Sequence, residues 1–348
     1  MKILMIGLGG IGQRHLRNLR TLLGDEMEVL AYRVRGISQV VTDKLDIEPG
    51  ADIEKKYDIK VYHELDRALD AGPDVALVCN PSSLHVPVAL EAARANCSLF
   101  LEKPLSHNLD GVEELIDEVE GRNLVGLVGY QLRFHPCLVR LAELIRQGAI
   151  GSVVAVRLEV GEYLPGWHTY EDYRQMYASK SNLGGGVVLS QIHEMDQVYS
   201  LFGLPERIFA VGGHLTRLEI DVEDTASILM QCRADGRSIP VHLHQDYIQR
   251  PPSRQYQVIG DAGKILVDLR TTSLTCYDGE GQVREQVTLD QFPRNQLFLD
   301  EMTHLLACLR REQAPLVTIR DGSKSLRMAL AAKESIAKGG IIDMSSGL

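Results

Sequence analysis

The stretch Met1-Lys2-Ile3-Leu4-Met5-Ile6-Gly7-Leu8-Gly9-Gly10-Ile11-Gly12 opens the chain and decides the fold around it. Residues 2–8 are a short apolar run, which is typical of a buried strand. Residues 10–23 repeat apolar side chains at helical spacing. Strand, glycine-rich turn and helix in this order predict the start of a βαβ unit.

Each glycine of the turn meets a different need. Gly7 permits the tight turn, Gly9 lets the backbone approach a pyrophosphate, and Gly12 lets helix and strand pack closely. Gly10 and Ile11 begin the helix, whose amino terminus stabilises phosphate charge. We therefore expect a dinucleotide at these residues. The alternative is a purely structural glycine turn.

The first 130 residues continue the same alternation of short aliphatic runs and helical patterns. The continuous apolar run at 75–78 is typical of a strand buried on both faces of a parallel sheet. We predict a doubly wound α/β Rossmann domain with a mostly parallel sheet over residues 1–130. Its expected strands are 2–8, 28–34, 60–62, 74–79, 98–101 and 124–129, and its expected helices are 10–23, 63–71, 83–96 and 108–121.

The pattern changes beyond residue 130, where longer strands follow closely on one another. Turn pairs such as Asp235-Gly236 separate several of them, which favours antiparallel pairing. We predict a C-terminal α+β domain over residues 131–348, with a large, mostly antiparallel sheet. Its expected strands are 153–161, 207–214, 225–233, 238–246, 255–260 and 264–269, and its expected helices are 136–147, 191–202, 295–310 and 321–338.

Composition excludes several other classes. The chain has 348 residues, enough for about two domains, and its net charge is 37 − 47 = −10, which argues against nucleic acid or anionic lipid as partner. No apolar run reaches the roughly 18 residues of a membrane span, and we expect neither a signal peptide nor a membrane partner. The six cysteines form no C-x-x-C pair, so we expect no metal site, reduced thiols and a cytoplasmic location.

The end of the second expected strand indicates which dinucleotide binds. An acidic residue there would hold the ribose hydroxyls of NAD, but the sequence has Arg33 and Arg35. Guanidinium groups suit a 2′-phosphate better than a neutral diol, so NADP is favoured over NAD. The alternative is a solvated loop, with Asp43 or another group on the ribose.

Two further motifs follow expected strands at the sheet edge where α/β proteins bind ligands. Asn80-Pro81-Ser82-Ser83-Leu84-His85 comes after the fourth strand, and Glu102-Lys103-Pro104 after the fifth. Lys103 could hydrogen-bond a reacting hydroxyl there, and Pro104 could fix a cis peptide. The alternative for Lys103 is an ordinary exposed lysine.

A third motif runs from Gly184-Gly185-Gly186 to His193 and Asp196. Three glycines permit close approach of the backbone to a ligand or neighbour. His193 and Asp196 share a helix face, and an imidazole is suited to take the proton of an alcohol during oxidation. The alternative is a structural histidine.

Together these motifs resemble the glucose-fructose oxidoreductase, inositol dehydrogenase and rhizopine-catabolism (Gfo/Idh/MocA) family over nearly the whole chain. Gln131-Leu132-Arg133-Phe134-His135-Pro136 at the domain junction is a further mark. The resemblance implies the two domains predicted above. It also implies homodimers or homotetramers formed through the open face of the second sheet.

The resemblance also implies roles for particular residues. Lys103 would hydrogen-bond the substrate hydroxyl and His193 would be the general base or acid. Many sugar and cyclitol dehydrogenases of the family carry an Asp four residues before the His, where this chain has Leu189. Asp196, Glu194 or a carboxylate or phosphate of the substrate would then supply the negative charge. The residues implied near the cofactor are Asn80, Pro81, His85, Glu102, Lys103, Pro104 and Gln131.

The segment 163–174 contains the only Trp of the chain and several tyrosines. Aromatic faces stack on sugar rings, so we predict a substrate loop here; a packed connection is the alternative. The expected substrate-binding residues are Tyr163, Trp167, Tyr170, Gln191 and Asp196.

These patterns predict an NAD(P)-dependent oxidoreductase that transfers hydride to or from a secondary alcohol of a sugar, sugar acid, nucleotide sugar or cyclitol. Lys103 and His193 would handle the proton. One alternative is a cofactor-binding sensor without turnover. Another is an enzyme that recycles bound cofactor during an elimination reaction.

Overall fold

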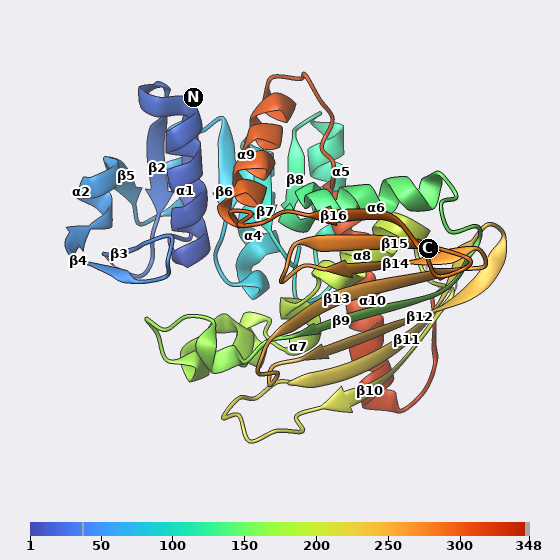
Figure 1. Cartoon of the computed structure of the whole chain (residues 1–348). Coiled ribbons are helices and arrows are strands. Elements are labelled where there is room, and N and C mark those ends of the chain that lie inside the picture. Colours follow the sequence, from blue (N-terminus) through green and yellow to red (C-terminus); the bar gives the residue numbers. More distant parts are fainter. Residues whose placement is uncertain (37, 345–348) are drawn as a thin grey trace.

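The computed structural model describes residues 1–36 and 38–344, and it builds the chain around two sheets that lie side by side (Figure 1). The first sheet is parallel throughout, in the order β5-β2-β1-β6-β7-β8. The predicted Rossmann domain is confirmed. The strands of this sheet are β1 (Lys2–Ile6), β2 (Glu28–Tyr32), β5 (Ile59–Tyr62), β6 (Val75–Val78), β7 (Ser98–Glu102) and β8 (Gly126–Gly129).

Helices cover both faces of the first sheet. Ile3 and Met5 of β1 pack in one cluster with side chains of α1 (Gly10–Leu23) and α9 (Asn295–Leu309). Leu4 and Ile6 point the other way, because successive strand residues alternate between faces. Their cluster includes α4 (His85–Arg94) and α5 (Val112–Gly121), and α3 (Leu65–Asp70) joins it through Ala68.

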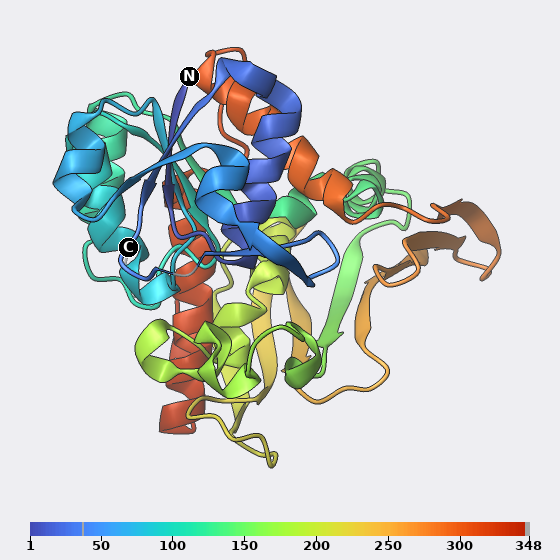
Figure 2. The same ribbon diagram turned by 90° about the vertical axis from the view of Figure 1, so that its left-hand side faces the viewer.

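Helix α9 therefore covers the first sheet although it comes from the last quarter of the sequence, and Figure 2 shows it beside α1. Asn295 and Asn18 exchange side-chain hydrogen bonds across this contact. By sequence, the expected boundary between residues 130 and 131 places α9 in the second domain. Its apolar side chains nevertheless pack on the sheet of the first domain.

The second sheet has nine strands in the order β16-β15-β14-β13-β9-β12-β11-β10-β17. Every neighbouring pair is antiparallel except β9 with β12, which confirms the mostly antiparallel α+β prediction. Its strands are β9 (Val153–Gly161), β10 (Arg207–Gly213), β11 (Thr225–Ala234), β12 (Arg237–Asp246), β13 (Ser253–Gly260), β14 (Gly263–Asp268), β15 (Ser273–Asp278), β16 (Val283–Thr288) and β17 (Ile342–Asp343).

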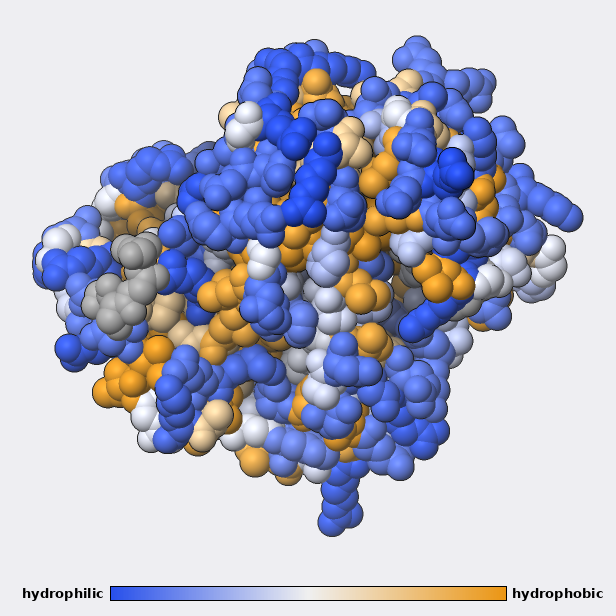
Figure 3. All heavy atoms as spheres, turned by 180° about the vertical axis from the view of Figure 1, so that it is seen from behind, coloured by the Kyte–Doolittle hydropathy of each residue, from blue (hydrophilic) through white to orange (hydrophobic). Residues whose placement is uncertain are grey.

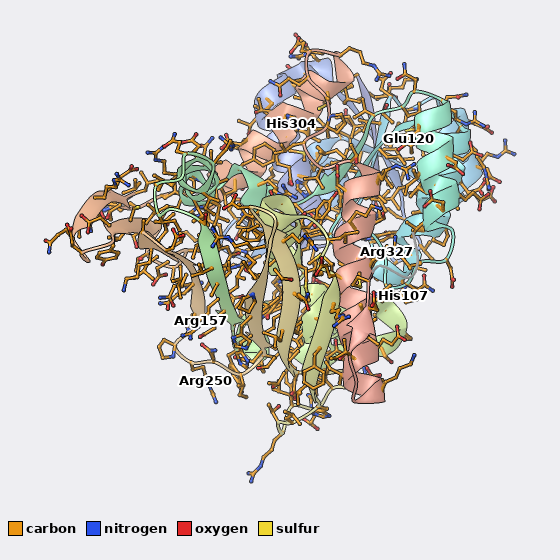
Figure 4. The ribbon with its side chains drawn as sticks, turned by 90° about the vertical axis from the view of Figure 1, so that its right-hand side faces the viewer. His107, Glu120, Arg157, Arg250, His304 and Arg327 are labelled. Carbon is orange, nitrogen blue, oxygen red and sulfur yellow. The ribbon has the colours of Figure 1, made fainter. Side chains whose placement is uncertain are left out.

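One face of this sheet is covered by α7 (Val187–Ser190), α8 (His193–Phe202) and α10 (Ile319–Lys338). Figure 1 looks onto the other face, which we call the open face, with α10 behind the strands. Figure 4 shows Arg157 of β9 on the side away from α10. The pairing register places Phe209, Leu229, His242 and Arg157 in one row across four strands of the open face.

Helix α10 also joins the two sheets. It begins with a capping box in which Thr318 and Asp321 bond each other's backbone amides. Thr318 forms an isolated bridge with Leu127 of β8, and Arg320 pairs with Glu120 of α5, which Figure 4 shows near the upper end of α10. These contacts hold the two domains in one arrangement. In sequence, helix α6 (Pro136–Arg146) comes after the last strand of the first sheet and before the first strand of the second.

Three features lie outside the predicted elements. Strands β3 (Gln39–Val41) and β4 (Ile47–Asp52) form a small separate hairpin that leads into α2 (Ile53–Tyr57). Residues 162–186, here called the strap, contain four short 3₁₀ turns and project below the first domain (Figures 1 and 2). Strands β15 to β17 were also not predicted.

The reverse side of the molecule is largely hydrophilic, and apolar residues appear there in groups between hydrophilic ones (Figure 3). Within the described residues, no helix combines the length and apolar character that a bilayer crossing requires. All six cysteines are free and buried.

Candidate active site

The glycine turn after β1 is close-packed at two positions and open at a third. Gly7 has φ of +99°, and a Cβ added there would lie 2.6 Å from the backbone N of Asn80. A Cβ at Gly12 would lie 2.1 Å from the carbonyl O of Gly7. A Cβ at Gly9 would meet nothing within 4 Å, so the space above this glycine is open to a ligand.

The amino terminus of α1 fits a phosphate group. Its N-cap is Gly9, no side chain caps it, and its first turn carries no acidic residue. The amides of a 14-residue helix therefore face the open space with their partial positive charge. Asn80 adds a buried side-chain oxygen without a hydrogen-bond partner among the described residues. These features fit a dinucleotide, whose pyrophosphate the turn at Gly9, Gly10 and Ile11 would hold.

The two arginines expected to read the 2′-phosphate differ in their surroundings. Arg33 is 7% exposed and its guanidinium pairs with Glu54, while its backbone N donates to Tyr62. Arg35 is exposed to solvent. Of the two, only Arg35 presents its charge openly to solvent.

His85 braces the two motifs that follow β6 and β7. Its Nε2 lies 2.8 Å from the carbonyl O of Asn80, and its Nδ1 lies 2.9 Å from that of Pro104. Burial lowers the pKa of His85 despite these carbonyls, so the neutral ring donates to one of them at a time. Pro81, the second residue of the first motif, is the N-cap of a short 3₁₀ turn.

Behind Lys103 lies a buried acidic cluster. Glu102 Oε1 lies 2.6 Å from His15 Nε2, and its Oε2 accepts from the backbone N of Lys103 at 3.1 Å. Glu301 of α9 is 1% exposed, and neither of its oxygens has a partner among the described residues. Burial and the charge of Glu102 raise the pKa of Glu301 well above its usual value, so Glu301 is protonated at neutral pH.

Lys103 reaches from the first domain to the second. Its peptide bond to Pro104 is cis, and its Nζ donates to the carbonyl O of Ser190 at 2.8 Å. Ser190 is the last residue of α7, three residues before His193. This hydrogen bond sets the Lys103 ammonium beside the start of α8.

His193 is 5% exposed at the first position of α8, with its ring 5.7 Å from that of Tyr130 in an edge-on contact. Its buried Nδ1 has no hydrogen-bond partner among the described residues. Burial first, and then the positive charges of Lys103, Arg254 and Arg294, lower the pKa of His193 well below its usual value. The imidazole is therefore neutral at pH 7.

The acidic residues near His193 are already paired. Asp196 accepts two hydrogen bonds from Arg133, at 2.6 and 2.9 Å, and a third from Ser325. Glu194 accepts from Arg254 at 2.7 Å and from the hydroxyl of Tyr256 at 2.8 Å. The candidates for the negative charge missing at Leu189, which is itself buried, are thus bound to other partners.

Two predicted glutamines are buried at the same junction. Gln191 donates to the carbonyl O of Asp246 at 3.1 Å, and its side-chain oxygen has no partner among the described residues. Gln131 lies in the 3₁₀ turn after β8 and is 8% exposed.

The aromatic residues of the strap lie in three different places. A Cβ at Gly10 would be 2.7 Å from the hydroxyl O of Tyr170, so this tyrosine touches the glycine turn. Burial raises the pKa of Tyr170 to about 12. Trp167 packs edge-on against Tyr247 at 5.3 Å, and Tyr163 lies under Arg250 at 3.9 Å.

The three glycines at the end of the strap approach protein neighbours. A Cβ at Gly184 would lie 2.2 Å from Ser82 Oγ, and one at Gly185 would lie 2.4 Å from the carbonyl O of Tyr177. Ser82 also donates to the carbonyl O of Gly184. The glycines therefore seat the strap against the loop after β6.

Sequence reasoning missed two residues whose positive charges help to lower the pKa of His193, namely Arg254 at the start of β13 and Arg294 just before α9. Arg294 is separated from His193 by about a hundred residues, and no local motif marks it. Which charged side chains lie near His193 can be known only once the fold is known. Among the described residues, no group of three or more His, Cys, Asp or Glu side chains could hold a metal ion.

Comparison with known protein families gives matches along both domains. Residues 1–130 match the GFO_IDH_MocA model, described as an oxidoreductase family with an NAD-binding Rossmann fold. Residues 142–344 match the model for the C-terminal alpha/beta domain of that oxidoreductase family.

Individual relatives span nearly the whole chain. The myo-inositol 2-dehydrogenase of Thermotoga maritima is 28% identical, over 97% of this chain and 96% of its own. The scyllo-inositol 2-dehydrogenase (NAD(+)) of Bacillus subtilis is 24% identical, over 96% and 94%. The WlbA dehydrogenase of Bordetella pertussis, solved in complex with NADH and UDP-GlcNAcA, has a TM-score of 0.78 at 20% identity, over 99% of this chain and 97% of that one; it shares the fold.

Proposed function

Because the chain belongs to the Gfo/Idh/MocA oxidoreductase family, we propose that it interconverts a secondary alcohol and a ketone on a sugar, sugar acid, nucleotide sugar or cyclitol, with NAD or NADP as redox partner. The relatives named for inositol dehydrogenation support a polyhydroxylated substrate. Lys103 and His193 are the proposed catalytic residues.

One observation carries this proposal above the others. Lys103 directly follows strand β7 of the first domain and His193 begins a helix of the second, yet the Ser190 carbonyl holds the lysine near that helix. The His193 ring is neutral at pH 7, so one of its nitrogens can accept a proton. A substrate hydroxyl between these two side chains would meet a hydrogen-bond donor and a base together.

The charges of Lys103 and His193 indicate the role of each residue. When bound, the nicotinamide ring supplies the acceptor or donor of hydride. The Lys103 ammonium would donate a hydrogen bond to the substrate oxygen and stabilise its alkoxide character. The neutral imidazole of His193 would take the hydroxyl proton during oxidation. Because burial lowers its pKa, the imidazolium would return that proton readily during reduction.

The choice between NAD and NADP depends on Arg35 in this proposal, because the Arg33 guanidinium already pairs with Glu54. The name of one relative specifies NAD, which does not support the NADP preference expected from the sequence. Fluorescence titration with NADH and with NADPH separates the two. Tighter binding of NADPH that is lost in Arg35→Gln would support the NADP preference, and equal or tighter binding of NADH would reject it.

Turnover itself is tested by the absorbance of the reduced nicotinamide. The purified protein is mixed with NAD or NADP and a panel of inositols, hexoses, uronic acids and nucleotide sugars. Accumulation of free reduced cofactor with one class supports simple dehydrogenation. Consumption of substrate without accumulation would favour the cycle with bound cofactor. Cofactor binding without substrate consumption or cofactor turnover, in both the oxidative and the reductive direction, would favour the sensor.

Assembly through the open face of the second sheet is part of the same proposal. Val154, Phe209, Val211 and Leu229 are exposed on its strands, between 37% and 61%. Exposed apolar side chains on a helix-free sheet face are typical of a protein interface. A homodimer or homotetramer would bury them.

A further inference from the structure

Tyr170 of the strap lies against the first turn of α1. A Cβ added at Gly10 would be 2.7 Å from the hydroxyl O of Tyr170 and 3.7 Å from its Cζ, so the tyrosine approaches this glycine with its hydroxyl first. Gly10 is the first residue of α1, and the space above the preceding Gly9 is open. The hydroxyl therefore stands beside the space that fits the cofactor pyrophosphate, and it does not fill that space.

The Tyr170 hydroxyl carries a proton that it can donate. Burial, and then the charge of Glu171, raise its pKa to about 12, so the hydroxyl is neutral at pH 7. Among the described residues, the backbone of Gly10 is the hydrogen-bonding group that acts on it, and an amide N–H can only donate to the phenolic oxygen. The hydroxyl proton is left for another acceptor. A phosphate oxygen at the glycine turn would be such an acceptor.

Neighbours within the strap hold the ring that carries this hydroxyl. His168 stacks on Tyr170, with ring centroids 5.3 Å apart and an angle of 14° between the planes. The Nδ1 of His168 in turn lies 2.7 Å from Oε1 of Glu171. Because the ring is already placed, a contact of its hydroxyl with a ligand would cost less conformational entropy.

The strap is anchored in both domains. Near its start, the backbone N of Leu164 donates to the carbonyl O of Tyr247 at 3.0 Å, and Trp167 packs edge-on against the same tyrosine of the second domain. Near its end, Ser82 of the loop after β6 donates to the carbonyl O of Gly184 at 3.2 Å. Figure 2 shows the strap below α1. The strap thus extends from the second domain to two motifs of the first domain that are expected at the cofactor.

From this arrangement we infer that the strap is a clamp on the cofactor, in which the Tyr170 hydroxyl donates a hydrogen bond to an oxygen of the pyrophosphate. This inference rests on the proposed function, because it assigns a residue of the second domain to the cofactor of the same site. A hydrogen bond to an ionised phosphate is charge-assisted and stronger than one between neutral groups. The contact would tie the strap to the first domain whenever a dinucleotide is bound.

The test separates the pyrophosphate from the other parts of the cofactor. NADH and NADPH are titrated by fluorescence. ADP-ribose, which has the pyrophosphate but no nicotinamide, and adenosine, which has no phosphate, are titrated by calorimetry, so no readout depends on turnover. The variants are Tyr170→Phe, which removes only the hydroxyl, and Tyr177→Phe as a matched control in the same strap.

We expect Tyr170→Phe to weaken the binding of the reduced dinucleotides and of ADP-ribose by about 5- to 30-fold and to leave the binding of adenosine unchanged. Tyr177→Phe should bind all probes like the wild type. Hydrogen exchange gives a second readout. ADP-ribose should slow the exchange of the backbone amides of residues 164–175 in the wild type, and much less in Tyr170→Phe.

Three results would overturn the inference. The first is equal affinity of Tyr170→Phe and the wild type for ADP-ribose. The second is tighter binding of ADP-ribose by Tyr170→Phe, which would mean that the hydroxyl obstructs the site. The third is an equal loss for adenosine and ADP-ribose, which would mean that the variant disturbs the whole pocket.

Failure of the inference and failure of the proposed function give different results. A wild type that binds neither the dinucleotides nor ADP-ribose would contradict both. Normal cofactor binding and normal turnover in Tyr170→Phe would contradict the clamp alone.

Discussion

At the scale of single residues, the pocket is defined by what surrounds each titratable group. Glu102 and Glu301 lie in the same buried cluster, and within the described part of the chain only Glu102 has hydrogen-bond partners. The apolar surroundings and the neighbouring charge keep Glu301 protonated, whereas an ordinary glutamate ionises at neutral pH. This difference gives a stability effect that depends on pH.

We predict that Glu301→Gln stabilises the protein at pH 8 and has little effect at pH 5. The folded pKa of Glu301 lies above the unfolded value, so its favourable contribution is complete below the unfolded pKa of about 4.5 and is lost as pH rises. Gln keeps the shape and has no proton to lose. Thermal unfolding at both pH values measures the effect.

Glu312→Gln, just beyond the same helix and exposed, is the matched control and should show no such dependence. If Glu301→Gln is equally stabilising or destabilising at both pH values, Glu301 is not the buried neutral acid described above.

Some features of the site could be predicted from the sequence, and others could not. The tight packing at Gly7 and Gly12 and the open space at Gly9 were predictable because the G-x-G-x-x-G pattern between a strand and a helix marks these positions. The partner of Asp196 was not, because Arg133 lies 63 residues away in sequence. The same holds for Arg294, because its effect on the pKa of His193 depends on where the start of α9 lies in the fold.

At the scale of elements, most helices and strands were predictable because their apolar periodicity is strong. The strands β3 and β17 were missed because they are short, and β16 because it is an edge strand with mostly exposed side chains; β4 and β15 were also missed. The packing of α9 on the first sheet could not be read from its sequence, because an amphipathic helix does not specify which sheet it covers.

The start of α6 provides a prediction for one element. His135 is its N-cap, and Nδ1 accepts a hydrogen bond from the backbone N of Cys137 at 3.2 Å. Burial, and then the charge of Arg254, lower the pKa of His135 to about 4. Protonation would destroy this acceptor.

Because the folded pKa lies below the unfolded value of about 6.5, stability should fall as pH decreases from 6.5 to 4, by about 3 kcal/mol from His135 alone. His135→Asn keeps a capping acceptor without a titrating group. Urea unfolding at pH 7 and pH 4.5 should show a smaller loss in the variant than in the wild type. An equal loss in both proteins would contradict this assignment.

At the scale of the whole molecule, the two sheets have different tasks. The first is covered by helices on both faces and presents its strand ends to the pocket. The second has an open face whose central row includes Phe209 and Leu229, paired in register. The two domains meet where Ser82 bonds the end of the strap and where Lys103 bonds the Ser190 carbonyl at the end of α7.

We predict that Leu229→Glu weakens self-association by at least about tenfold, because a charge placed in an apolar interface loses its hydration without gaining a partner. Leu229 is 49% exposed in the single chain, so the protomer itself should keep its fold. Sedimentation velocity over a range of concentrations measures this. Leu316→Glu, similarly exposed but in the loop before α10, is the control. A wild type that sediments as a monomer would contradict the proposed interface.

The central claim is that Lys103 and His193 act together on one substrate hydroxyl. The measurement that tests it most directly is kcat/KM of Lys103→Met, His193→Gln and the double variant on the best substrate of the panel, with Lys338→Met as control. Each single change should lower kcat/KM by about 10²- to 10⁴-fold while cofactor affinity is kept. The kcat/KM of the double variant should be close to that of the less active single variant. Losses that multiply in the double variant, or near-normal turnover in either single variant, would contradict the account.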